Sequence, residues 1–246
     1  MIGAAWTVAR RELAAFFYSP IAYGIATIVL VLNGALYFIA MKALDGDLKE
    51  TASILYGAFY LYWFIALFVP ALLTMRLIAE EKRSGTIEML MTAPVTDLSV
   101  VLGKYTAVLL YYASMWAPTL LYFALVRLLG GEPDFGLLLS SFLGTLLVGA
   151  LFLSIGLFAS ACTSNQVLAA ASGIVLNLVF FFLPLGTYIV AKSETKQFLE
   201  RYSVMSIVQS GFLTGVVDTA HVVYFLSLAG FFLFLTVRVV EARKWK

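Results

Sequence analysis

Long runs of apolar residues, separated by short polar stretches, dominate the sequence. A helix needs about 20 apolar residues to cross the hydrocarbon core of a bilayer. Six segments meet that length: residues 20–41, 53–75, 98–129, 136–160, 167–190 and 221–240. The pattern predicts an all-α integral membrane protein with six transmembrane helices, all within one transmembrane domain that covers residues 1–246.

Two further apolar patterns are too short or too mixed to cross a bilayer. Before the first span, Trp6 and Phe16 alternate with Arg10 and Arg11, which predicts an amphipathic helix lying at the membrane surface. In the outer segment 191–220, the middle is apolar but short. A re-entrant helix before the sixth span and a folded surface loop both fit this stretch.

The polar segment 76–97 separates the second and third spans and is dense in both signs of charge. The pattern predicts that the second span continues as helix through Arg83 and ends at Gly85 as a left-handed cap. Thr86 then begins a short amphipathic helix that Pro94 ends. The segment is therefore predicted to be a stiff cytoplasmic coupling element with a short coupling helix, and an ordinary solvated loop is the alternative.

Composition supports a membrane protein, since 62% of residues are hydrophobic, 12% are charged and mean hydropathy is +0.97. Soluble domains are about half apolar and a quarter charged. A net charge of +2 gives no reason to expect nucleic acid as a partner. With one histidine and one cysteine, Cys162, the chain has no metal-ligand set, no disulfide framework and no Cys–His or Ser–His–Asp arrangement.

Lysines and arginines indicate the orientation, because they are enriched on the cytoplasmic side. With the N-terminus inside, the inner segments carry ten of them and the outer segments six. We therefore expect a multi-pass protein of the cell inner (plasma) membrane with both termini in the cytoplasm.

Several residues within the spans invite specific interpretations. In the third span, Lys104 is expected to extend its ammonium to the lipid headgroups, and Pro118 is expected to kink the helix. Small residues at four-residue spacing allow helices to approach closely in lipid. They are Ser141, Thr145 and Gly149 in the fourth span, and Ala169, Gly173 and Asn177 in the fifth. Packing within one chain and packing across a dimer both fit this spacing.

The charged segment also resembles a known family. The string EEKRSGTIE at residues 80–88, followed by Leu90, Thr92, Ala93 and Pro94, is similar to the signature of type-2 ABC-exporter permeases. The same resemblance extends to Gly103 with Lys104. It also extends to the N- and C-terminal segments around residues 11–20 and 224–245. Together they look most like the gliding-motility branch of these permeases.

The resemblance implies a six-span half-transporter that dimerises with a second copy or with a homologous permease. A separate ABC ATPase subunit, which binds ATP-Mg, would drive it. In that family the inner segment between the second and third spans docks on the ATPase. This role is implied here for Glu80, Glu81, Arg83, Gly85, Thr86 and Glu88.

The residues themselves agree that nucleotide chemistry lies elsewhere. No G-x-x-x-x-G-K-[ST] phosphate loop is present, and no polar stretch is long enough for a nucleotide-binding domain. The expected function is a non-catalytic permease subunit of an ATP-driven exporter, with no cofactor bound directly. The alternatives are an ion-coupled carrier, a membrane enzyme of lipid metabolism and a non-transporting membrane anchor for a soluble complex. The carrier would need carboxylates within the spans or a broken-helix site, and the enzyme would need an acid, base or metal constellation.

Overall fold

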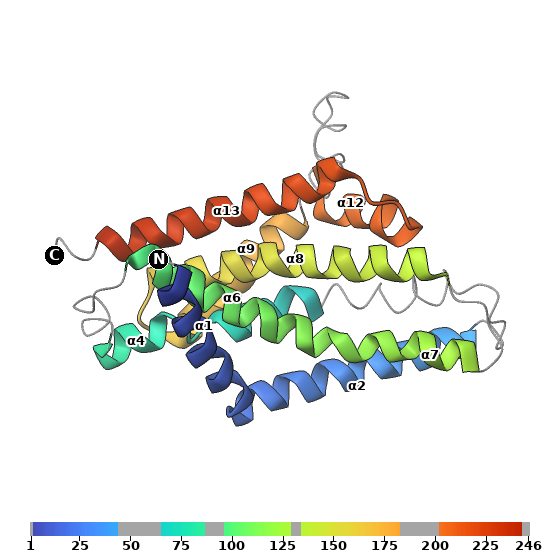
Figure 1. Cartoon of the computed structure of the whole chain (residues 1–246), viewed down its shortest axis with the longest axis horizontal. Coiled ribbons are helices and arrows are strands. Elements are labelled where there is room, and N and C mark those ends of the chain that lie inside the picture. The colour runs from blue at the N-terminus through green and yellow to red at the C-terminus, as the bar shows by residue number, and fades with distance from the viewer. Residues whose placement is uncertain (1, 44–64, 87–95, 129–133, 183–201, 243–246) are drawn as a thin grey trace.

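The computed structural model describes residues 2–43, 65–86, 96–128, 134–182 and 202–242. Within these ranges every regular element is a helix, and the long helices lie roughly along one axis (Figure 1). The all-α prediction is confirmed. In chain order the elements are α1 (Ile2–Phe17), α2 (Pro20–Ala43), α4 (Ala79–Ser84), α6 (Asp97–Trp116), η2 (Ala117–Leu120), α7 (Leu121–Leu128), α8 (Phe135–Cys162), α9 (Gln166–Phe181), α12 (Val204–Ser210), η4 (Phe212–Thr214) and α13 (Thr219–Glu241).

Four helical stretches among the described residues are long and apolar enough to cross a membrane: Pro20–Ile39, Asp97–Leu120, Phe135–Cys162 and Thr219–Glu241. They correspond to the first, third, fourth and sixth predicted spans. The fifth is represented by α9, an apolar helix of 16 residues, and the second by a helical stretch at residues 65–74. Because the rest of these two spans lies outside the described residues, the number six stays a prediction.

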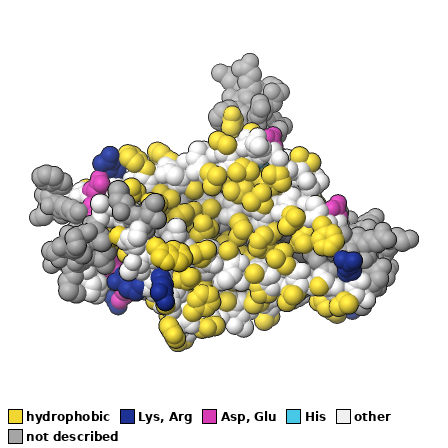
Figure 2. Space-filling view, in the orientation of Figure 1, with side chains coloured by type: hydrophobic (Ala, Val, Ile, Leu, Met, Phe, Trp, Pro, Cys, Tyr) yellow, Lys and Arg dark blue, Asp and Glu magenta, His cyan; other side chains and the backbone are white. Residues whose placement is uncertain are grey.

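The surface is organised as expected for a protein surrounded by lipid. On the face shown in Figure 2, hydrophobic side chains cover the middle, and charged side chains gather mainly toward the two ends of the long axis. Large apolar side chains such as Val31, Phe38 and Phe234 are more than half exposed. Exposed apolar surface on this scale is typical of a membrane-facing protein, so the chain is a multi-pass membrane protein.

Helix α8 forms the centre of the bundle and is the most deeply buried of the four candidate spans. It packs against α6, α9 and α13. Glycines permit these close contacts: a Cβ at Gly149 would overlap the Tyr112 ring, and one at Gly156 would overlap the Thr74 hydroxyl. The neighbouring helices are therefore held at a distance that a larger side chain would not allow.

Local capping signals determine where the third span begins and bends. Thr96 lies at the N-cap of α6, where its hydroxyl accepts a hydrogen bond from the Ser99 backbone N–H at 3.3 Å. Pro118 lies in the first positions of η2, which interrupts the α-helical hydrogen bonding between α6 and α7. The interruption lies at Pro118, where the sequence predicts a kink.

The apolar stretch before the sixth span folds as a packed helix rather than an irregular loop. It forms α12 and η4, whose buried side chains include Val204, Ile207 and Phe212. The Ser140 hydroxyl of α8 donates to the Phe212 carbonyl at 2.8 Å, which fastens η4 to the bundle. This unit lies at the end of the molecule opposite α4 (Figure 1). Residues 191–201 of the predicted outer loop lie outside the described residues.

Candidate functional site

The charged segment after the second span forms a compact elbow, here defined as residues 75–86. The helix at residues 65–74 ends in a turn at 75–78, and α4 follows. The prediction of one unbroken helix through Arg83 is therefore wrong. Gly85 adopts a left-handed conformation with φ of 73°, so the predicted cap at the end of α4 is confirmed.

A serine from α8 compensates for the break in the elbow. The Ser160 hydroxyl accepts hydrogen bonds from the backbone N–H groups of Ile78 (3.2 Å) and Ala79 (3.0 Å), and it donates to the Met75 carbonyl at 3.1 Å. Helix ends leave such backbone groups without partners inside the helix. Ser160 therefore stabilises a turn that the local sequence does not signal. The Lys82 ammonium adds a second link to α8 by donating to the Ala161 carbonyl.

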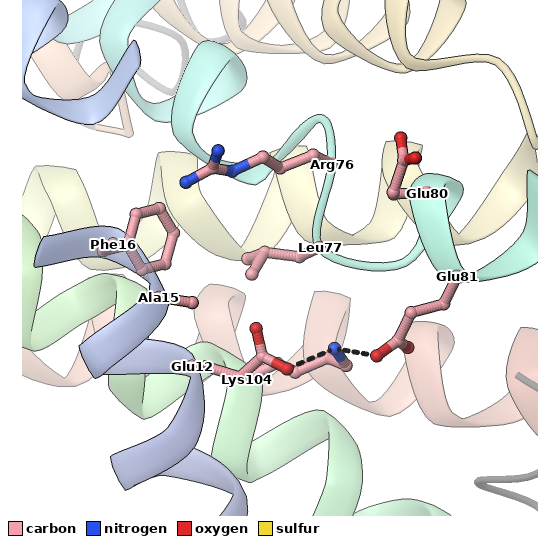
Figure 3. Close-up of a pocket in the computed structure, with 8 residues that line it drawn as sticks. All are labelled: Glu12, Ala15, Phe16, Arg76, Leu77, Glu80, Glu81 and Lys104. Carbon is pink, nitrogen blue, oxygen red and sulfur yellow. Dashed lines mark hydrogen bonds and ion pairs between the residues drawn. The ribbon is translucent and has the colours of Figure 1, made fainter. Parts of the chain in front are cut away.

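Lys104 is buried, with 2% of its side chain exposed, and does not extend to the headgroups as expected. Its Nζ lies 2.9 Å from Oε1 of Glu12 in α1 and 2.6 Å from Oε1 of Glu81 in α4 (Figure 3). Helix α1 crosses α6 next to Lys104, at Gly103, where an added Cβ would lie 2.7 Å from the Ala5 carbonyl oxygen. This close crossing helps to cover the lysine and brings Glu12 to it.

Arg11 completes a network of two cations and two carboxylates, which we call the hub (Arg11, Glu12, Glu81 and Lys104). Its Nη2 lies 2.8 Å from Oε1 of Glu12 and 3.7 Å from Oε1 of Glu81. Burial raises the pKa of Glu12, but the charge of Lys104 and the hydrogen bonds from Arg11 and Lys104 outweigh burial, so the pKa lies below its ordinary value. The hub ties α1, the elbow and α6 to one another.

A cavity of about 210 Å³ lies beside the hub (Figure 3). Its lining residues are Glu12, Ala15, Phe16, Arg76, Leu77, Glu80, Glu81 and Lys104. Arg76 donates to the Ser19 hydroxyl at 2.8 Å, and its guanidinium lies 5.2 Å from the Phe16 ring centroid. Glu80 pairs with Arg83 through Oε1 at 3.1 Å, whereas its Oε2 is buried without a hydrogen-bond partner among the described residues.

The structure separates the residues for which ATPase docking was expected. Glu81 turns inward to Lys104, while Glu80 and Arg83 form an ion pair on the outer side, where their side chains are 40% and 65% exposed. Thr86 follows Gly85, and its hydroxyl lies 2.9 Å from that of Ser84. Glu88, together with the short coupling helix predicted between Thr86 and Pro94, falls in the undescribed range 87–95.

The small residues of the fourth span contact other parts of the same chain. Ser141 donates to the Phe212 carbonyl at 3.3 Å, and Thr145 donates to the Ser141 carbonyl at 2.9 Å. Gly149 lies directly against the Tyr112 ring. All three are buried. These contacts hold η4 and α6 close to α8 within one chain.

The small residues of the fifth span lie on the face that contacts the helix at residues 65–74. A Cβ added at Gly173 would lie 3.3 Å from the Ala71 Cβ, and the Asn177 amide donates to the Leu67 carbonyl at 3.1 Å. Ala169 is buried on the same helix. In the described residues this face is therefore in contact with the helix at 65–74, which leads into the elbow.

The hub was not expected from the sequence, because its members lie far apart in the chain. Glu12 and Lys104 are 92 residues apart. The available signal was a lysine within an otherwise apolar span, since such a group is normally paired when it is buried. Among the residues that the structure describes, no group of three His, Cys, Asp or Glu side chains is arranged to hold a metal ion.

These features define a polytopic helical membrane protein whose charged elbow is fastened to several spans. The family model described as ABC-2 family transporter protein matches residues 39–237. Since the match covers most of the chain, the protein belongs to the ABC-2 family of transporter proteins. It is therefore a membrane permease component of an ABC transporter, a class that normally works with an ABC ATPase and is generally not catalytic. A comparison with curated proteins found no match.

Proposed function

We propose that this chain is the permease subunit of an ATP-driven type-2 ABC exporter, most like the gliding-motility branch. It forms the translocation pathway as a dimer, with a second copy or a homologous permease. A separate ATPase subunit binds ATP-Mg and supplies the force. The permease moves between inward- and outward-open states as that force tilts its spans.

The observation that carries this proposal is the double attachment of the elbow. On one side Glu81 is joined through Lys104 to α6 and α1, and on the other Ser160 and Lys82 join the elbow to the end of α8. A displacement of α4 would be passed to all of these helices, because both attachments would have to break for it to move alone. The elbow is thus suited to transmit a push from a soluble partner.

The exposed side of α4 is suited to dock the ATPase. Glu80 and Arg83 present both signs of charge there, and Ser84 and Gly85 beside them are exposed. Charged groups at the rim of an interface mainly set the association rate and the choice of partner. We assign Glu80, Arg83, Gly85, Thr86 and Glu88 to this docking surface, and we assign Glu81 to the link behind it.

The arrangement of the chain ends fits cytoplasmic termini. Helices α1 and α4 and the C-terminal end of α13 lie at the same end of the molecule (Figure 1). With the elbow facing an ATPase in the cytoplasm, both termini would lie in the cytoplasm as well. The proposed location is the cell inner membrane.

A charge swap tests the docking role without removing the ion pair. In the double variant Glu80→Arg/Arg83→Glu, the (i, i+3) pair persists with reversed polarity, so the spans should keep their thermal stability. Like charges placed opposite each other across an interface cost several kcal/mol. Co-purification with the cognate ATPase and ATP-driven flux in vesicles should therefore fall at least about tenfold.

The matched control is Arg238→Glu/Glu241→Arg. This pair is also spaced i, i+3, lies at the same end of the molecule, and has side chains 63% and 39% exposed. The control should bind the ATPase and transport as the parent does. Unchanged binding and flux in the Glu80/Arg83 swap would refute the docking role. ATPase binding without any ATP-dependent flux in the parent protein would instead favour a membrane anchor.

A further inference from the structure

The cavity beside the hub carries both signs of charge near the point where the surface helix α1 turns into the first span. We propose that it binds the headgroup of a membrane phospholipid with a primary ammonium, of the phosphatidylethanolamine class. The ammonium would lie by the carboxylates and the phosphate by Arg76. This inference rests on the proposed function in one respect, the placement of α1 at the inner membrane surface.

The carboxylates of the cavity can accept more hydrogen bonds than the protein supplies. Lys104 and Arg11 bind Glu12 and Glu81 through Oε1, and Arg83 binds Glu80 through Oε1. The Oε2 atom of Glu80 is buried with no hydrogen-bond partner among the described residues. A buried carboxylate oxygen without a donor is unfavourable. A primary ammonium offers three donors and a positive charge.

The distribution of charge favours the same ligand. Both signs of charge line the cavity, with carboxylates at Glu12, Glu80 and Glu81 and cations at Arg76 and Lys104. A headgroup that carries an ammonium and a phosphate has a complementary charge for each of them. A volume of about 210 Å³ holds several water-sized groups, since one water occupies about 30 Å³ in the liquid.

Arg76 provides a place for the phosphate at the other side of the cavity. Its Nη1 donates to Ser19 and its Cζ lies over the Phe16 ring, so the guanidinium is held in position. A guanidinium has five N–H donors in a fork that matches phosphate oxygens. On either side of Ser19 in the chain, Tyr18 in the turn after α1 and Ile21 in α2 are 86% and 58% exposed, and acyl chains would run along the protein there.

Other common phospholipids match this arrangement less well. Phosphatidylglycerol brings a phosphate for Arg76 but no cation for the carboxylates. Phosphatidylcholine brings a cation whose methylated nitrogen has no N–H to donate to the Oε2 atom of Glu80. The site should therefore select by the donors on nitrogen rather than by net charge alone.

Native mass spectrometry of the purified full chain tests the proposal. The protein would be released from membranes that contain equal amounts of phosphatidylethanolamine, phosphatidylcholine and phosphatidylglycerol. We expect phosphatidylethanolamine to be retained roughly tenfold over the other two, a factor that corresponds to about 1.4 kcal/mol. Glu80→Gln should abolish this preference, and Arg76→Gln should lower the retention of all three lipids, because each of them carries a phosphate. Glu241→Gln, on the exposed pair of α13, should change neither.

Three outcomes would overturn the proposal: equal retention of all three lipids, retention in both cavity variants that matches the parent protein, or full displacement of the lipid by soluble phosphoethanolamine. The last result would reassign the cavity to a water-soluble amine. Melting temperatures measured in phosphatidylcholine bilayers verify that the variants are folded. Because no ATPase or nucleotide is present, lipid selectivity is read independently of docking. Arg76→Gln, which lies outside the docking surface, should retain less lipid while still binding the ATPase.

Discussion

Replacing Lys104 with methionine removes the cation that Glu12 and Glu81 share while keeping an unbranched apolar stem. Lys104 Nζ lies 2.9 Å from Glu12 and 2.6 Å from Glu81, and 2% of the side chain is exposed. In the variant the two carboxylates would face each other with Arg11 as their remaining cation in the hub. We expect α4 to lose its attachment to α6, while its links to α8 through Ser160 remain.

The size of the effect follows from burial. Removing one partner of a buried ion pair costs about 3–5 kcal/mol. The carboxylates of Glu12 and Glu81 are 15% and 16% exposed and keep Arg11 at 2.8 and 3.7 Å, so the lower end, about 3 kcal/mol, applies. Since 1.4 kcal/mol is a factor of ten, local opening of the elbow should become about 100-fold more frequent.

Hydrogen–deuterium exchange of the α4 amides, measured by mass spectrometry in a bilayer, reports this opening directly. The triple variant Lys104→Met/Glu12→Gln/Glu81→Gln should recover most of the protection, because it leaves no buried carboxylate unpaired. The charge that remains in the hub, Arg11, has a side chain that is 61% exposed. As a control, Arg238→Met removes one partner of an exposed pair and should change local stability by about 0.5 kcal/mol or less. If Lys104→Met exchanges at the rate of the parent protein, the hub does not hold the elbow.

Two further predictions concern pH and packing. Because the pKa of Glu12 is held below its ordinary value of 4.5 by the hub cations, its stabilising contribution is present at neutral pH and is lost as the pH falls through that lowered pKa. The protection factors of the α4 amides, which compare each rate with the intrinsic exchange rate at the same pH, should therefore fall only below about pH 4.5, and Glu12→Gln should flatten this dependence. Gly149→Ala would force a methyl group into the Tyr112 ring and should lower the free energy of unfolding by about 1–3 kcal/mol. Gly230→Ala, with nothing within 4 Å of the added Cβ, should be neutral or stabilising in the same thermal unfolding assay.

Features set by neighbouring residues were predictable from the sequence. The starts and lengths of the long helices follow from apolar runs, and Thr96, Pro118 and Gly85 act on their own backbone. The turn at residues 75–78 was not predictable in this way. It depends on Ser160, which is 82 residues from Ile78 in the chain, and the local sequence continues a helical pattern.

It was predictable from the sequence that Glu80 and Glu81 would make contacts with different partners. Successive residues on a helix point about 100° apart, so Glu80 and Glu81 direct their carboxylates differently and make different ion pairs, although both line the cavity. Which of them turns inward depends on where Lys104 lies, and that requires the packing of α1 over Gly103. Long-range packing, rather than helix propensity, therefore decided the part of the site that the sequence did not reveal.

The hydroxyl of Ser160 binds both sides of the turn, since it contacts Met75 before the bend and Ala79 after it. The bend therefore cannot straighten without releasing a side chain that belongs to the central helix. If an ATPase drives α4, as proposed, Ser160 would act as a pivot, so that the elbow would rotate about the end of α8 rather than slide along it. The lever arm of that rotation would be the distance from the Ser160 hydroxyl to the tip of α4.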